Sequence, residues 1–83
     1  MNTTIEDKTF DPVLLRNFYK YIERGIITPI NYSSIAERLN LSDVSRYQAY
    51  LNPSARSYRK PSNSMCRLAY YVAQELLAEG WQI

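Results

Sequence analysis

Four polar side chains within residues 45–52 are of the types that read the edges of DNA bases. Arginine pairs bidentately with guanine, and glutamine or asparagine pairs with adenine. Arg46 and Gln48 are therefore the main candidates for base contacts, and Ser45 and Asn52 support them. Asp43 could accept a hydrogen bond from cytosine, but near a helix start its charge is more simply explained by the helix dipole.

A basic interval without carboxylates contains these residues. From Val44 to Gln74 the chain has no Asp or Glu, although its net charge is only +2. Phosphate contacts come from Lys, Arg, hydroxyl groups and backbone amides. The predicted phosphate contacts are Tyr50, Arg56, Ser57, Tyr58, Arg59 and Lys60. A merely solvated loop is the alternative for this segment, and of Tyr47 and Tyr50 we expect Tyr50 to be the more exposed.

Two short helices joined by a tight turn are predicted to position the base contacts. Asn31 can cap a helix over residues 32–39, and Asn40 stands where the turn needs a residue that tolerates positive φ. Ser42 can then cap a third helix over residues 42–51, which must end before Pro53.

The apolar pattern and the turn residue together resemble the helix-turn-helix DNA-binding superfamily. The matching residues are Ile35, Ala36, Leu39, Asn40 and Leu41, followed by Val44-Ser45-Arg46. The resemblance implies that the second helix of the pair enters the major groove. Val44 comes about two residues earlier than the family spacing, which leaves the rotation of this helix open. An inward stripe of Val44, Tyr47 and Leu51 would leave the predicted base contacts on the open face.

The flanking segments complete an all-α prediction of a small four-helix domain. Asp11 and Pro12 indicate a first helix that runs to about Arg24 and stops at Gly25. Residues 26–30 are interpreted as a connector, since Pro29 cannot donate to a strand ladder. The last helix is expected over residues 64–79, with Gly80 ending it. The domain then spans residues 10–83, after a flexible tail of residues 1–9.

The last helix is apolar over a wide arc, which suggests a partner subunit. A chain of 83 residues buries only about 60% of its unfolded surface, so its core is marginal and a second copy is expected to supplement it. The predicted dimer interface consists of Tyr70, Ala73, Leu77 and Trp81.

The composition excludes several classes of site. The chain has no histidine, and Cys66 is its only cysteine, so zinc sites, an internal disulfide and a His-based triad are excluded. We expect no enzyme activity, no metal and no cofactor, and a packing role for Cys66. No signal peptide or membrane span is evident, so a soluble cytoplasmic protein is expected. RNA or single-stranded DNA binding would need aromatic residues on a sheet, and none is predicted.

These observations predict a sequence-specific duplex-DNA-binding transcriptional regulator, a repressor, acting as a homodimer. Its site would be an inverted repeat with half-sites about 34 Å apart. The alternative is a small helical protein–protein interaction module or inhibitor, of the kind that mobile elements encode. An enzyme is a distant third.

Overall fold

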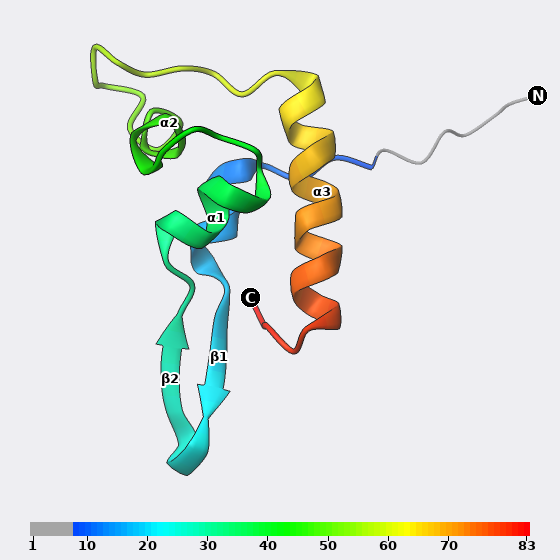
Figure 1. Cartoon of the computed structure of the whole chain (residues 1–83). Helices are drawn as coiled ribbons and strands as arrows, with labels where there is room; N and C mark the ends of the chain where they lie inside the picture. The colour runs from blue at the N-terminus through cyan, green and yellow to red at the C-terminus, as the bar shows by residue number, and fades with distance from the viewer. Residues whose placement is uncertain (1–7) are drawn as a thin grey trace, which may run out of the picture.

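A two-stranded antiparallel sheet precedes the α-helices, so the fold is a small mixed α/β fold and the all-α prediction is wrong. The computed structural model describes residues 8–83. Residues 1–7, which hold most of the predicted tail of residues 1–9, lie outside the described residues. Figure 1 shows a hairpin extending away from the helices, with the long helix α3 along one side.

The first helical segment is much shorter than predicted. It is the 3-10 helix η1, Pro12–Asn17, and the predicted helix is wrong beyond this point. Asp11 caps the segment as expected, because its side chain accepts a hydrogen bond from the Val13 amide at 3.0 Å. Phe18 then takes an extended backbone, and its buried ring enters the core.

Residues 19–29 form a β-hairpin where a helix end and a connector were predicted. Strand β1, Tyr19–Ile22, pairs antiparallel with β2, Ile26–Pro29. The turn η2, Glu23–Gly25, contains two residues with positive φ, Arg24 at 68° and Gly25 at 72°. Gly25 therefore supplies a left-handed residue as expected, but in a hairpin turn instead of at a helix end.

Pro29 is compatible with a strand because its missing amide hydrogen would point away from β1. The Ile30 amide donates to the Phe18 carbonyl at 3.0 Å. Hydrogen-bonded positions alternate along an antiparallel strand, so position 29 faces the open edge of the sheet. Proline is tolerated at edge positions of this kind. The reason for predicting a connector was therefore wrong.

Helix α1, Tyr32–Arg38, agrees with the prediction. Asn31 is its N-cap, and the Asn31 side chain accepts a hydrogen bond from the Ser34 amide at 2.7 Å. Ile35 and Ala36 are buried, so the inward face of this helix was also predicted correctly.

The turn after α1 depends on Asn40, whose φ is 59°. The Leu41 amide donates to the Ala36 carbonyl at 2.8 Å, and the Asn40 amide donates to the Glu37 carbonyl at 3.1 Å. A left-handed residue with this pair of hydrogen bonds is the Schellman ending of a helix. The prediction of a positive φ at Asn40 is confirmed.

Helix α2, Val44–Gln48, is shorter than the predicted helix of residues 42–51. Its N-cap is Asp43 and not Ser42, because the Asp43 carboxylate accepts a hydrogen bond from the Arg46 amide at 3.1 Å. After Gln48 the chain continues in single turns instead of an α-helix.

Helix α3, Asn63–Ala78, lies close to its predicted bounds, with Ser62 as its N-cap. It ends at Gly80, whose φ is 97°, and the Trp81 amide donates to the Leu76 carbonyl at 3.0 Å. Even α3, the longest helix in residues 8–83, is not long and apolar enough to cross a membrane.

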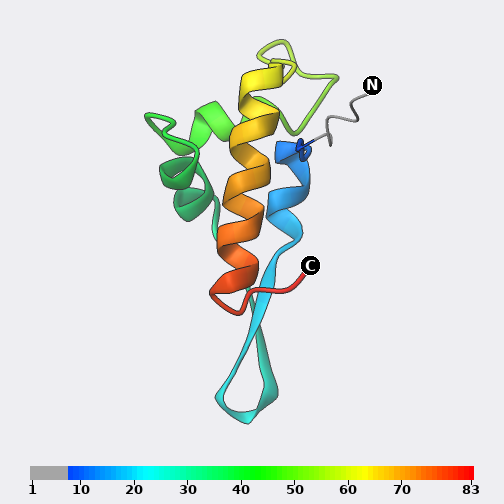
Figure 2. The same ribbon diagram turned by 90° about the vertical axis from the view of Figure 1, so that its right-hand side faces the viewer.

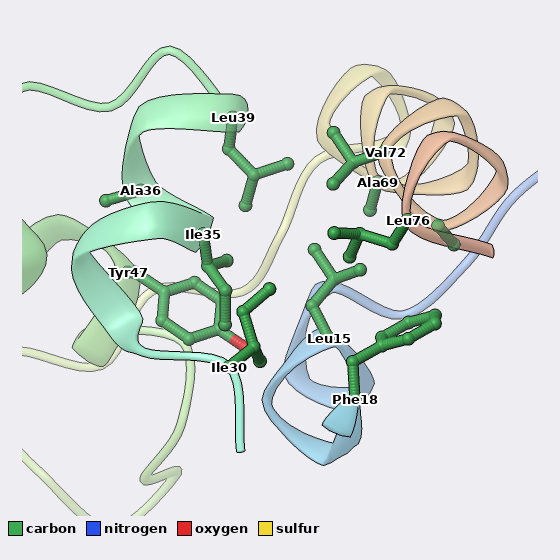
Figure 3. Packing of buried hydrophobic residues seen from close by; sticks show 11 residues of the cluster. Leu15, Phe18, Ile30, Ile35, Ala36, Leu39, Tyr47, Ala69, Val72 and Leu76 are labelled. Carbon is green, nitrogen blue, oxygen red and sulfur yellow. The ribbon is translucent and has the colours of Figure 1, made fainter. Parts of the chain in front are cut away.

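One core joins η1, α1, α2 and α3, as Figure 3 shows in close-up. Figure 2 shows α3 with the N-terminal segment on one side and α1 and α2 on the other. The buried residues are Leu15, Phe18, Ile30, Ile35, Ala36, Leu39, Tyr47, Ala69, Val72, Ala73 and Leu76. The hairpin contributes little to this core, because β2 is exposed along its whole length.

An ion-pair cluster that was not predicted connects α1 to α3. The Arg38 guanidinium lies 2.6 Å from the Glu75 carboxylate and 2.7 Å from that of Glu79. Hydrogen bonding to Arg38 lowers the pKa of Glu79, so this contribution to stability is lost as the pH falls through the folded pKa of Glu79. The sequence did carry a signal, because Glu75 and Glu79 are four residues apart on one helix face.

Candidate nucleic-acid interface

The four predicted base contacts all lie at the surface. Ser45, Arg46 and Gln48 are exposed on α2, and Asn52 is exposed just beyond it. The structure thus presents three of them from one short helix. Asn52 belongs to the following loop, where its side chain accepts a hydrogen bond from the Ser54 amide at 3.0 Å.

Tyr47 determines which face of α2 is exposed. Its side chain is fully buried, and its hydroxyl donates a hydrogen bond to the Pro12 carbonyl at 2.7 Å. Burial raises the pKa of the Tyr47 hydroxyl well above its usual value, so it stays protonated as a donor. Leu51, just beyond α2, is half-buried and packs against the core, whereas Val44 is half-buried but is not among the residues packed on it. Tyr47 and Leu51 therefore face inward as predicted, Val44 does not reach the core, and Tyr50 is the more exposed tyrosine of the pair, as expected.

Asp43 fixes the first turn of α2. The Ser45 hydroxyl donates to the Asp43 carboxylate at 2.6 Å, and this hydrogen bond, with that from the Arg46 amide, lowers the pKa of Asp43. Asp43 is thus ionised near neutral pH and already holds two donors. The Ser45 oxygen retains only its acceptor capacity for a further partner.

A groove beside α2 brings Arg46 and Arg59 together. It has a volume of about 370 Å³ and is lined by Leu41, Ser45, Arg46, Ala49, Tyr50 and Arg59. The Arg59 amide donates to the Ala49 carbonyl at 2.9 Å, which holds the loop against the end of α2. Within residues 8–83, no Asp or Glu lines the groove and neither arginine forms an ion pair. The groove is therefore lined by two arginine side chains that are thirteen residues apart in sequence.

The predicted phosphate contacts do not form one surface. Tyr58 and Lys60 line a second pocket, and Tyr50 lines both hollows. Arg56 and Ser57 are exposed on the loop and line neither. Only Arg59 and Tyr50 of the six lie beside the predicted base contact Arg46 in the groove.

The predicted dimer interface on α3 is partly used within the chain. Ala73 is 2% exposed and belongs to the core. Trp81 packs against that core, and the Lys20 ammonium lies 4.9 Å from its ring centroid. Tyr70 is half-buried, and Leu77, at 48% exposure, is the member that most clearly faces outward. These four residues therefore do not make one exposed face.

The sheet that the sequence analysis missed carries aromatic side chains. Tyr19 and Tyr21 lie on one face of β1 with ring centroids 5.5 Å apart, edge to face. The nearby charges are mixed, with Lys20 on the strand and Glu23 and Arg24 in the turn. An aromatic platform for single strands would need a basic groove along it, and this hairpin does not supply one.

Comparison with known proteins gives no relative for this chain: no family model, curated protein or solved structure matches it. The described residues 8–83 hold no group of three or more Cys, Asp or Glu side chains placed to bind a metal ion.

Proposed function

We propose that this chain binds duplex DNA through a helix-turn-helix made of α1 and α2, and that it represses transcription by occupying a promoter. The groove in which Arg46 and Arg59 meet beside the exposed face of α2 carries this proposal. Arginine is the residue best suited both to guanine edges and to phosphate oxygens. The Schellman turn at Asn40 and the buried Tyr47 support it, because together they set the angle and the rotation of α2.

In this proposal the residues divide their roles by position. Arg46 and Gln48 project from α2 toward base edges in the major groove, with Ser45 as an acceptor. Arg59, held beside them by its backbone hydrogen bond to Ala49, binds a flanking phosphate. Exposed Arg56 adds charge to the same binding event.

A mobility-shift assay over a salt series tests the proposal, using duplexes selected from a random pool. Two phosphate contacts per chain, by Arg59 and Arg56, predict a slope of about −2 for log affinity against log salt concentration, and roughly twice that for a dimer. We expect binding to one preferred sequence to persist in the presence of unrelated competitor duplex DNA. A chain that binds no duplex DNA even at low salt would contradict the proposal.

We extend the proposal to a homodimer that pairs through the hairpin instead of α3. Tyr21, Ile22, Ile26 and Ile27 are 50–56% exposed, and within residues 8–83 no strand covers the outer edge of β2. An open apolar strand edge pairs readily with another strand. Two copies related by a two-fold axis can pair β2 with β2 in antiparallel orientation through Ile27.

Replacing Ile27 with lysine is expected to convert the dimer to a monomer, because a charge on an edge strand opposes pairing. Light scattering coupled to size-exclusion chromatography measures the mass. Leu77→Lys, on the exposed part of α3, is the matched control and should leave the dimer intact. If only Leu77→Lys dissociated the dimer, the interface would lie on α3 and not on the hairpin. If the unsubstituted chain were a monomer, neither surface would be a dimer interface.

One observation favours a different function. The apolar hairpin could instead dock on another protein, as expected for an interaction module or inhibitor. That function predicts no preferred DNA sequence and no effect of Arg46 substitution, so the mobility-shift assay also separates the two functions.

A further inference from the structure

A second pocket, distinct from the Arg46–Arg59 groove, lies between the 52–61 loop, the N-terminal segment and α3. It has a volume of about 540 Å³ and is lined by residues from 9–13, 50–53 and 58–61 together with Cys66. Its lining residues are Thr9, Phe10, Asp11, Val13, Tyr50, Leu51, Pro53, Tyr58, Lys60, Pro61 and Cys66. The Phe10 amide donates to the Cys66 carbonyl at 3.0 Å, which joins the N-terminal wall to α3.

The walls of this pocket suit an apolar body. Three aromatic rings, those of Phe10, Tyr50 and Tyr58, face it together with the aliphatic side chain of Leu51. Small-molecule sites are concave, have volumes of about 300 to 1,000 Å³, and combine apolar walls with a few polar groups. The pocket fits this description in both size and lining.

The charged side chains that line the pocket indicate which charge a ligand should carry. Among residues 8–83, Lys60 is the one cationic side chain that lines the pocket, and Asp11 is the one anionic side chain. The Asp11 carboxylate caps η1 by accepting a hydrogen bond from the Val13 amide at 3.0 Å. Within the same residues Lys60 forms no ion pair, so its ammonium can pair with an incoming anion.

We propose that this pocket binds a small amphiphilic carboxylate, with its aromatic or aliphatic body against Phe10, Tyr50 and Leu51 and its carboxylate at Lys60. Such a ligand would bridge the loop to the N-terminal segment and to α3. The binding itself is independent of DNA.

The position of the pocket gives the ligand a regulatory role, which rests on the proposed DNA-binding function. Tyr50 lines both hollows, and Lys60 follows Arg59 directly in the loop. A ligand that orders the loop also orders Arg59 beside Arg46, and prior ordering lowers the entropic cost of binding DNA. The ligand therefore raises the affinity for DNA.

Titration with 3-phenylpropionate, followed by amide NMR shifts and calorimetry, tests the site in the full chain. We expect saturable shifts confined to residues 9–13, 50–53 and 58–66, and weaker binding of the uncharged 3-phenylpropanamide. Lys60→Gln should weaken binding of the acid by about 1.4- to fivefold, the range for an exposed ion pair, and leave binding of the amide unchanged. Arg56→Gln, on the same loop but outside the pocket, is the matched control and should change neither.

Absence of saturable shifts at these residues, or equal binding of acid and amide, would overturn the proposal. An equal effect of Lys60→Gln and Arg56→Gln would do the same, because it would show nonspecific attraction to a basic loop. A mobility shift without added ligand measures DNA binding separately, so failure of the ligand site and failure of the DNA-binding proposal are distinguishable.

Discussion

Replacing Tyr47 with alanine is expected to lower the free energy of unfolding by about 3 to 5 kcal/mol, the cost of removing a large buried aromatic ring. Tyr47 is fully buried, and its ring meets those of Tyr32 and Tyr50 edge to face, with centroids 5.5 and 6.4 Å away. A domain of this length has a total stability of about 4 to 12 kcal/mol. The substitution therefore removes a large part of it. Urea unfolding followed by circular dichroism measures the change.

Two further variants separate the ring from its hydroxyl. Tyr47→Phe keeps the ring but removes the hydroxyl hydrogen bond to the Pro12 carbonyl, so we expect a loss of about 0.5 to 1.5 kcal/mol. Tyr71→Ala removes a tyrosine that is 58% exposed and should change stability by less than about 1 kcal/mol. If Tyr47→Ala were as mild as Tyr71→Ala, the orientation of α2 on the core would be wrong.

The elements that were predicted correctly are those whose signals are local. Asn31 caps α1, Asn40 ends it, and Ser62 and Gly80 mark the ends of α3. Each of these residues acts within about one turn of its own position, so a single sequence carries the information.

The hairpin was not predicted because its residues are compatible with both a helix and a strand. The apolar residues of 18–22 fit a helix stripe as well as a strand, and Gly25 serves either a helix end or a tight turn. The choice depends on pairing with residues 26–29, which is not a local property. Strand β1 also bonds through Tyr19 to Gln82, with both amide-to-carbonyl distances at 2.8 Å, and that contact spans most of the chain.

In the candidate site, too, some features could be predicted from local sequence and others could not. The burial of Tyr47 and Leu51 follows from their helical spacing, and the sequence sufficed for it. Which hollow Arg59 and Lys60 each line depends on the path of the loop, to which the hydrogen bond between Arg59 and Ala49 contributes. A loop without periodicity gives no sequence signal for the direction of its side chains.

Removal of Arg46 and Arg59 together is expected to lower the affinity for the preferred DNA site by about 100-fold. The two single variants should differ in kind. Arg46→Ala should weaken the free energy of binding to the preferred site by about 1 to 3 kcal/mol. It should also reduce the discrimination between bases at one base pair. Arg59→Ala should weaken binding to all DNA sequences alike, and it should reduce the slope of log affinity against log salt concentration by about 1. Competition binding against a panel of single-base variants measures both effects.

A charge control is needed because losing any arginine weakens attraction to DNA. Arg24→Asn removes one positive charge from the hairpin turn, and asparagine tolerates the positive φ at this position. Its effect on affinity should be small and independent of sequence, since the turn lies away from α2 (Figure 1). If Arg46→Ala behaved like Arg24→Asn, its guanidinium would act only through net charge. If Arg46→Ala instead lowered the salt slope without altering base preference, both arginines of the groove would bind phosphate. Gln48 would then be the main residue that contacts bases.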